Sequence, residues 1–174
     1  MKKIEIDTFL KFRFLSNPHF SPDGTKIAFT VSVPDRETNG YLSDLYLYDL
    51  GKKTVSRVTC AGDAKIWSWT AENTLIFTAA RTASLKKEKE NGTSFFYEIS
   101  PSGGEASCRA SVPASVTGIR LLPDRRYLLT IRHDNYKDTR KKSYEVFDEL
   151  PFWANGQGIV NKKRTRLAVY DLES

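Results

Sequence analysis

The chain has 174 residues, 40% of them hydrophobic, and its 27 Lys and Arg against 21 Asp and Glu give a net charge of +6. This composition excludes intrinsic disorder and is typical of about one globular domain. No apolar stretch approaches the roughly 18–20 residues of a membrane helix, and the charged segment 1–7 does not resemble a secretory signal. Because Cys60 and Cys108 are too few for a disulfide framework, we expect a reduced, cytoplasmic compartment and small buried thiols.

Three segments share a turn followed by an apolar run. The clearest turn is Pro22-Asp23-Gly24, which combines a fixed φ, a side chain that bonds its own backbone and a residue that accepts positive φ. Glu72-Asn73 and Asp124-Arg125 occupy the same place with weaker turn chemistry. The segments lie at 20–29, 69–77 and 121–129.

A second strand pattern follows each of these segments, at 45–50, 95–99 and 167–172. Turn residues come after the first two copies, at 51–53 and 102–104, and a short strand pattern at 55–59 ends the first unit. The third unit is longer than the others, so we place an insertion at about 136–160.

Each unit therefore combines period-two strands or short apolar runs with turns, a pattern that favours sheet over helix. A period near 50 residues with about four strands is typical of a β-propeller blade, which buries its faces against neighbouring blades. We predict an all-β chain, a partial β-propeller of about three four-stranded antiparallel blades, the third incomplete. One domain covers 1–174, with blades at about 14–60, 64–110 and 115–174, and the insertion lies in the third. Because propellers have 4–8 blades, we expect the chain to be the front of a longer protein.

Several side chains have structural interpretations in this arrangement. Trp67 and Trp69 are two apart, so they point to one face of their strand and are predicted to pack against a neighbouring blade. The basic segments 86–89, 137–142 and 162–166 are interrupted by other residues and lie between apolar runs, so we interpret them as solvated loops and expect no nucleic-acid partner.

Three features together point to a known family. The first is His-Phe-Ser-Pro-Asp-Gly-Thr-Lys-Ile-Ala-Phe at 19–29, with Tyr-Leu-Tyr-Asp at 46–49. The second is Trp-Ser-Trp-Thr at 67–70 with Leu-Ile-Phe at 75–77, and the third, the most discriminating, is Leu-Pro-Phe-Trp-Ala-Asn-Gly at 150–156. Over nearly its whole length the chain resembles the N-terminal propeller part of prolyl-oligopeptidase-family serine peptidases, of the acylaminoacyl-peptidase or dipeptidyl-aminopeptidase-like branch.

This resemblance implies a propeller that gates peptide access to a C-terminal α/β-hydrolase domain with a Ser-Asp-His triad. That domain would lie beyond Ser174. The parent would be a cytoplasmic serine exopeptidase acting on short peptides or acyl-peptides, whereas this chain alone would be inactive. No cofactor or membrane association is implied.

The residues themselves support no catalytic, cofactor or metal site within the chain. A nucleophile elbow needs Gly-x-Ser-x-Gly, and the sequence has none. His19 and His133 lack a matching nucleophile motif and are interpreted as structural or loop residues. The two cysteines lack zinc-site spacing, and Gly103-Gly104 is a turn rather than a phosphate loop.

The insertion is the best functional candidate, because loops on a rigid scaffold commonly carry binding. Its apolar side chains could contact substrate or the hydrolase domain, or could instead pack back on the blade. These residues are Tyr144, Phe147, Leu150, Phe152 and Trp153.

Two other functions stay open at this stage: a stand-alone TolB-like or WD-repeat-like protein-binding module, and an intact enzyme with unfamiliar catalytic residues. An incomplete propeller exposes blade faces and an unpaired strand edge, so we also expect self-association.

Overall fold

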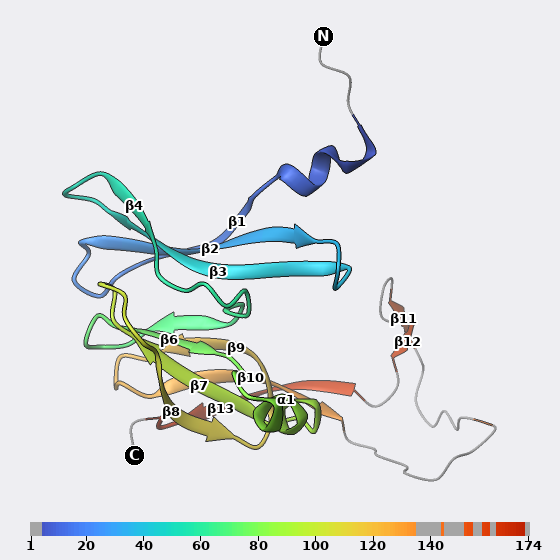
Figure 1. Cartoon of the computed structure of the whole chain (residues 1–174). Helices are drawn as coiled ribbons and strands as arrows, with labels where there is room; N and C mark the ends of the chain where they lie inside the picture. The colour runs from blue at the N-terminus through green and yellow to red at the C-terminus, as the bar shows by residue number, and fades with distance from the viewer. Residues whose placement is uncertain (1–4, 135–143, 145–151, 155–157, 161–162, 173–174) are drawn as a thin grey trace.

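The computed structural model describes residues 5–134, 144, 152–154, 158–160 and 163–172. Three antiparallel sheets follow one another along the chain (Figure 1), with four, four and three strands. The predicted fold class, an all-β partial propeller with an incomplete third blade, is confirmed, with one α-helix added to it.

Each sheet is built from strands in sequence order, except that the third closes with a strand after the long connection. The first sheet contains β1 (Phe14–Phe20), β2 (Lys26–Asp35), β3 (Gly40–Asp49) and β4 (Thr54–Arg57). The second contains β5 (Trp67–Trp69), β6 (Leu75–Thr78), β7 (Ser94–Ile99) and β8 (Ser107–Val112). The third contains β9 (Ser115–Leu121), β10 (Tyr127–Asp134) and β13 (Lys163–Tyr170).

Three smaller elements lie outside these sheets. A 3-10 helix, η1 (Ile6–Lys11), precedes β1, and helix α1 (Ala83–Glu90) connects β6 to β7. Strands β11 (Phe152–Ala154) and β12 (Gly158–Val160) form a separate two-stranded hairpin. Within the described ranges, the helices have six and eight residues and neither could cross a membrane.

The tight turns joining the first and second strands confirm the predicted repeat. Backbone amides close them from Ser21 to Lys26, from Thr70 to Thr74 and from Leu122 to Arg126, at 2.8–2.9 Å. Each turn contains a residue with positive φ: Gly24 at 69°, Asn73 at 60° and Arg125 at 69°. Asn takes this conformation at low cost, whereas Arg does so rarely. The backbone path is therefore shared, while the residue that adopts it differs.

Strand register aligns the three sheets residue by residue. The residue just before the turn pairs with the first hydrophobic residue of the next strand: Phe20 with Ile27, Trp69 with Leu75 and Leu121 with Tyr127. Three threonines, Thr30, Thr78 and Thr130, then follow at one equivalent position of the second strand, each three residues after that hydrophobic residue. Residues that share such a place are called equivalent below.

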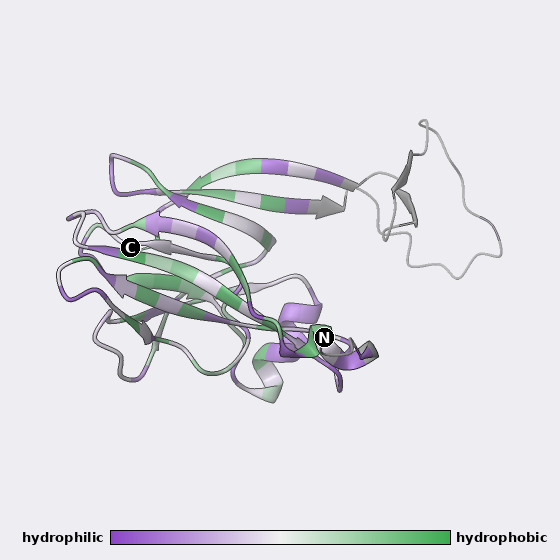
Figure 2. Ribbon diagram, turned by 90° about the horizontal axis from the view of Figure 1, so that it is seen from above, coloured by the Kyte–Doolittle hydropathy of each residue, from purple (hydrophilic) through white to green (hydrophobic). Residues whose placement is uncertain are grey.

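The core consists of two apolar layers, one between each pair of neighbouring sheets. Hydropathy alternates along many strands (Figure 2), so one sheet supplies side chains to two layers. Phe77 and Leu75 face the first sheet, whereas Ile76 and Phe96 face the third. The second sheet is therefore covered on both faces.

The two tryptophans pack as predicted from their spacing. Both are buried in the layer between the first and second sheets. The Trp67 indole N–H donates to the Thr30 hydroxyl at 2.9 Å, and the Trp69 indole N–H donates to the His19 carbonyl at 3.1 Å. A strand of only three residues is thereby attached to the sheet before it.

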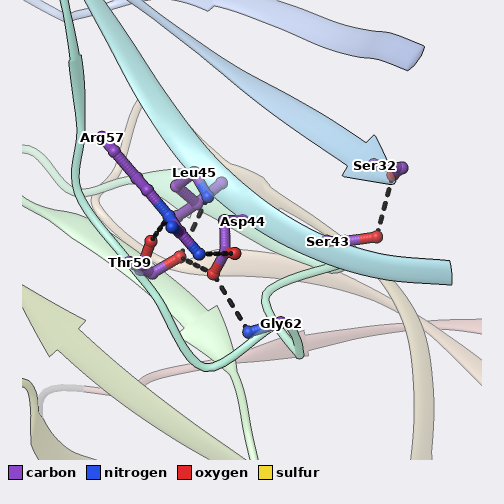
Figure 3. Close-up of polar contacts among 7 residues, drawn as sticks. All are labelled: Ser32, Ser43, Asp44, Leu45, Arg57, Thr59 and Gly62. Atoms are coloured by element: carbon purple, nitrogen blue, oxygen red, sulfur yellow. Dashed lines mark hydrogen bonds and ion pairs between the residues drawn. The ribbon is translucent and has the colours of Figure 1, made fainter. Parts of the chain in front are cut away.

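A polar network holds the connection from the first sheet to the second (Figure 3). The Asp44 carboxylate accepts from the Arg57 guanidinium at 2.6 Å, the Thr59 hydroxyl at 2.9 Å and the Gly62 amide at 3.1 Å. The Thr59 hydroxyl in turn accepts from the Leu45 amide at 3.0 Å. Because Asp44 is nearly buried, these donors replace the water that its charge loses on folding.

Two predictions about side-chain environment are wrong. Cys60 and Cys108 are both exposed rather than buried, because one lies in a connection and the other on the last strand of its sheet, at the rim. The basic segment 86–89 lies on helix α1, and 163–166 lies in β13, so neither is a loop. Residues 86–89 and 164–166 are exposed, as expected of charged residues, whereas Lys162 and the segment 137–142 lie outside the described residues.

Candidate functional site

The two ends of the sheets differ in the length of their connections (Figure 1). One end, named the turn end, has the short turns at 21–25, 70–74 and 122–126. The other end, named the loop end, has the β2–β3 tip at 36–39, the connection 79–93 with α1, and the connection 135–162. Binding residues concentrate on loops held by a rigid scaffold, so the loop end is the candidate functional region.

Side chains link neighbouring turns at the turn end. The Asp23 amide donates to the Asn73 side-chain carbonyl at 3.0 Å, and Glu72 forms an ion pair with Arg125. The Asp23 carboxylate also accepts from Ser21 at 2.6 Å and from Thr25, and these hydrogen bonds, led by Ser21, lower its pKa to about 2. At the turn end, side chains therefore link the first turn to the second and the second turn to the third.

An open cleft of about 740 Å³ lies at the loop end, between α1 and the connection from the first sheet to the second. It is named the loop-end cleft. Its lining combines cations, carboxylates and small apolar residues: Ala61, Asp63, Ala80, Arg81, Lys86, Lys89 and Glu90.

Two charged residues define the chemistry of this cleft. The Arg81 guanidinium carbon lies 5.0 Å from the centroid of the Tyr97 ring and 5.7 Å from that of Phe77, which is cation–π geometry. One Asp63 carboxylate oxygen is buried without a hydrogen-bond partner. Burial is the main cause that raises the pKa of Tyr97, and the charge of Asp63 adds a smaller effect in the same direction. The cleft thus offers donors and an acceptor to a polar ligand.

Helix α1 supplies three of the lining residues, and its start has a local cause. The Thr82 hydroxyl accepts from the Leu85 amide at 3.2 Å, which caps the first turn. Leu85 packs against the core layer between the first two sheets. This contact leaves Lys86 and Lys89 on the cleft side of the helix.

Two smaller clefts share no lining residue with the loop-end cleft. One, of about 290 Å³, lies between η1 and the β2–β3 tip, where Arg36 and Asp7 form an exposed ion pair at 3.5 Å. The other, of about 280 Å³, is lined by the first strands of all three sheets and includes Trp67 and Trp69. In a propeller, the first strands of the blades surround the central axis.

The predicted insertion residues are only partly described. Tyr144 is 64% exposed. The Phe152 and Trp153 backbones lie in β11, which pairs with β12 through Phe152 with Val160 and Trp153 with Ile159. Phe147 and Leu150 lie outside the described residues. The hairpin forms a sheet of its own (Figure 1), and both interpretations of the insertion stay predictions.

The histidines occupy strands. The His19 ring meets the Trp67 ring edge-on at a centroid distance of 5.6 Å, which is a packing role. His133 lies in β10. Among the described residues, no group of three or more His, Cys, Asp or Glu side chains is placed to hold a metal ion.

Sequence reasoning missed the loop-end cleft. Its residues come from separate segments, and α1 has neither a marked apolar face nor a buried residue to reveal it. One signal was present, because Thr82 before a run of Lys, Glu and Leu is a capping pattern. Nothing local indicates that Asp63 approaches this helix.

Comparison with known proteins relates the chain to peptidases. No family model matches it. The chain is 24% identical over its whole length to the uncharacterized peptidase YuxL of Bacillus subtilis, of which it covers 27%. It thus spans about a quarter of that relative's length.

Solved structures show a similarity of fold. An acylaminoacyl peptidase of Pyrococcus horikoshii superposes on 96% of the chain with a TM-score of 0.69 and 18% identity, and the chain covers 25% of it. The β-propeller domain of the Trilobed protease from Pyrococcus furiosus superposes on 71% with a TM-score of 0.50 and 15% identity, and 35% of it is covered. The predicted resemblance to these propellers is confirmed at the level of the fold.

Proposed function

We propose that this chain is the propeller part of a serine peptidase of the prolyl-oligopeptidase family, and that it controls access of short peptides or acyl-peptides to an α/β-hydrolase domain. The observation that supports this most is the match of nearly the whole chain to part of an acylaminoacyl peptidase. The likeness to the peptidase YuxL adds an independent comparison. A cytoplasmic location is part of the same proposal.

The loop end is the side that would face the hydrolase domain. Its long connections and its clefts offer contact surface, whereas the turn end is occupied by its own hydrogen bonds. In the loop-end cleft, Arg81, Lys86 and Lys89 could pair with peptide carboxylates, and Asp63 could accept from peptide N–H groups. The triad would belong to the hydrolase domain, so the propeller would act on substrate access.

The first experiment reads the gene beyond the codon for Ser174 and assays both products. We expect further repeats and then a Gly-x-Ser-x-Gly segment. The product of the complete gene should hydrolyse acyl-alanine or dipeptidyl nitroanilides, and the 174-residue chain should not. Turnover by the 174-residue chain itself, or a stop codon after Ser174, would contradict the proposal and favour a different enzyme or a binding module.

The insertion can be tested in the complete enzyme. If the β11–β12 hairpin contacts substrate, Trp153→Ala should lower kcat/KM for peptides about tenfold while the thermal unfolding midpoint stays unchanged. Trp153→Phe keeps an aromatic ring and should retain most of the activity. A Trp153→Ala enzyme that unfolds earlier but keeps its kcat/KM would instead assign the hairpin a structural role.

A further inference from the structure

Both signs of charge line the loop-end cleft. The cations are Arg81, Lys86 and Lys89, and the carboxylates are Asp63 and Glu90. A phosphate or another simple anion would be attracted by the cations and repelled by the carboxylates, because like charges repel at short range. A ligand with a positive group at one end and a negative group at the other is attracted by both. The mixture of charges therefore favours a zwitterion over a simple anion or cation.

Arg81 is held in a way that leaves its hydrogen-bond donors available to a ligand. Its guanidinium carbon lies 5.0 Å from the Tyr97 ring centroid and 5.7 Å from that of Phe77, and both rings belong to the core layer between the first two sheets. Stacking uses the flat face of the guanidinium, whereas its N–H groups point outward in the plane. The rings thus position a planar donor that suits a carboxylate.

Asp63 has a carboxylate whose solvation is incomplete. The residue is half-buried, and within the described part of the chain its Oδ1 atom is buried without a hydrogen-bond partner. Such unsatisfied acceptors are rare in folded proteins and cost free energy. The backbone is fixed on both sides of Asp63, because the Ser43 amide donates to the Gly62 carbonyl at 2.8 Å and the Ala64 amide donates to the Ser43 carbonyl at 3.0 Å. A cation that reaches this carboxylate from the cleft would therefore gain more than beside a fully hydrated Asp.

Helix α1 directs its charges toward the same space. Lys86, Lys89 and Glu90 are three or four residues apart and so share one face of the helix. Lys87 lies between them in sequence but does not line the cleft. Because lysine side chains are long and flexible, the two lining lysines can reach a carboxylate that is bound at Arg81.

The size of the cleft limits the length of the ligand. Its volume of about 740 Å³ lies within the roughly 300–1,000 Å³ of small-molecule sites. A tripeptide is at most about 10 Å long, since an extended chain spans about 3.3–3.6 Å per residue. Ala61 and Ala80 supply small apolar surface beside the charges. A peptide of a few residues therefore matches the cleft in size as well as in charge.

We propose that the loop-end cleft binds short peptides whose two ends are both free. Arg81, with Lys86 and Lys89, takes the C-terminal carboxylate, and Asp63 takes the N-terminal ammonium. This inference deepens the proposed function, on which its meaning for the peptidase rests, by naming the form of peptide that the cleft takes.

The proposal separates an acyl-peptide from the peptide that is released when it is cut. An N-acylated peptide has no ammonium for Asp63. When water cleaves the peptide bond after the acylated residue, its oxygen joins the new carboxylate and its two protons go to the nitrogen, which becomes an ammonium. The cleft therefore holds the released peptide in preference to the uncut acyl-peptide.

The test is a calorimetric binding titration of the 174-residue chain, without turnover, so its failure is distinct from failure of the peptidase proposal. Trialanine with both ends free should bind. N-acetyl-trialanine and trialanine amide should each bind about tenfold more weakly, because each lacks one charge-assisted contact. The proposal would be overturned if trialanine did not bind or bound no better than the capped forms. Inorganic phosphate that binds more tightly than trialanine would also overturn it and assign the cleft to anions.

Two variants assign the ends of the peptide to their residues. Asp63→Asn should weaken trialanine binding about tenfold and leave N-acetyl-trialanine unchanged, since that peptide has no ammonium. Arg81→Met keeps an apolar side chain over the rings, and it should weaken trialanine about tenfold and leave trialanine amide unchanged. Lys87→Ala is the matched control outside the cleft lining and should bind trialanine as wild type does.

The pattern across variants and peptides decides the outcome. Equal weakening of all three peptides by Asp63→Asn and Arg81→Met, or loss of binding in Lys87→Ala, would overturn the assignment. Circular dichroism checks that each variant is folded. If Asp63→Asn does not fold, Lys86→Ala and Lys89→Ala replace it, because both change exposed side chains and should weaken trialanine more than trialanine amide.

Discussion

The first and second sheets have the same topology and aligned residues, but they differ in how many of their faces are covered. Within the part of the chain that the structure describes, the second sheet packs on both sides and the first packs on one. Phe77 is fully buried, while its equivalent Phe29 is only half-buried. The comparison shows that the repeat sets the residue type at a position, whereas the neighbouring sheet sets how much that residue contributes to stability.

The largest expected effect comes from removing an aromatic ring at this pair of equivalent positions. Phe77→Ala should lower the free energy of unfolding by about 3–5 kcal/mol, the usual cost of a buried Phe. Phe29→Ala should cost about 1–2 kcal/mol, because less apolar area is buried there. Urea unfolding of both variants measures the difference. Equal costs for the two variants would mean that the first sheet is covered as fully as the second.

The second comparison concerns Asp44, whose hydrogen bonds hold the connection between the first and second sheets. Asp44→Ala leaves the Thr59 hydroxyl and the Gly62 amide without their acceptor, so the free energy of unfolding should fall by about 2–3 kcal/mol. Arg57→Ala is the matched control. Its side chain is half-exposed, so its loss should cost about 1 kcal/mol or less.

Chemical denaturation of both variants checks the order of these effects. If Arg57→Ala proved as costly as Asp44→Ala, the ion pair rather than the amide and hydroxyl donors would hold the connection. The connection between the second and third sheets is held by other hydrogen bonds. There Ser94 donates to the Ala114 carbonyl at 2.8 Å and accepts from the Val116 amide at 3.0 Å.

Much of the sheet architecture could be predicted from the sequence, because its signals are local. The Pro22-Asp23-Gly24 turn, the alternation in the strands and the spacing of Trp67 and Trp69 each act over a few residues. The exact register was harder to predict. Tyr97 is equivalent to Tyr46 rather than to Tyr48, because Tyr97 pairs with Phe77 as Tyr46 pairs with Phe29. A shift of two residues keeps the face, so the alternation alone does not reveal it.

Features that depend on distant segments could not be predicted in this way. The Asp44 network joins β3 to residues 57–62, and the loop-end cleft brings Asp63 near α1. The burial of the cysteines was predicted wrongly, because residue type alone does not tell whether a residue lies in a central strand, in an edge strand or in a connection. The insertion was recognised by its length, which says nothing about the contacts of its side chains.

The smallest expected effect concerns the turn end, where Asp23 bridges to the second sheet through its amide. Hydrogen bonds, chiefly from the Ser21 hydroxyl, hold the pKa of Asp23 at about 2, below the ordinary 3.8. A lowered folded-state pKa stabilises the fold at pH values above the unfolded-state pKa, and this contribution is lost as pH falls through about 2.

The free energy of unfolding of Asp23→Asn should therefore be slightly lower than that of wild type at pH 7, and this difference should close between pH 4 and pH 2. Urea unfolding of the two proteins across that range measures the difference. A difference that stays constant with pH would show that the Asp23 charge does not stabilise the turn, leaving the Asn73 contact and the backbone hydrogen bonds to hold it.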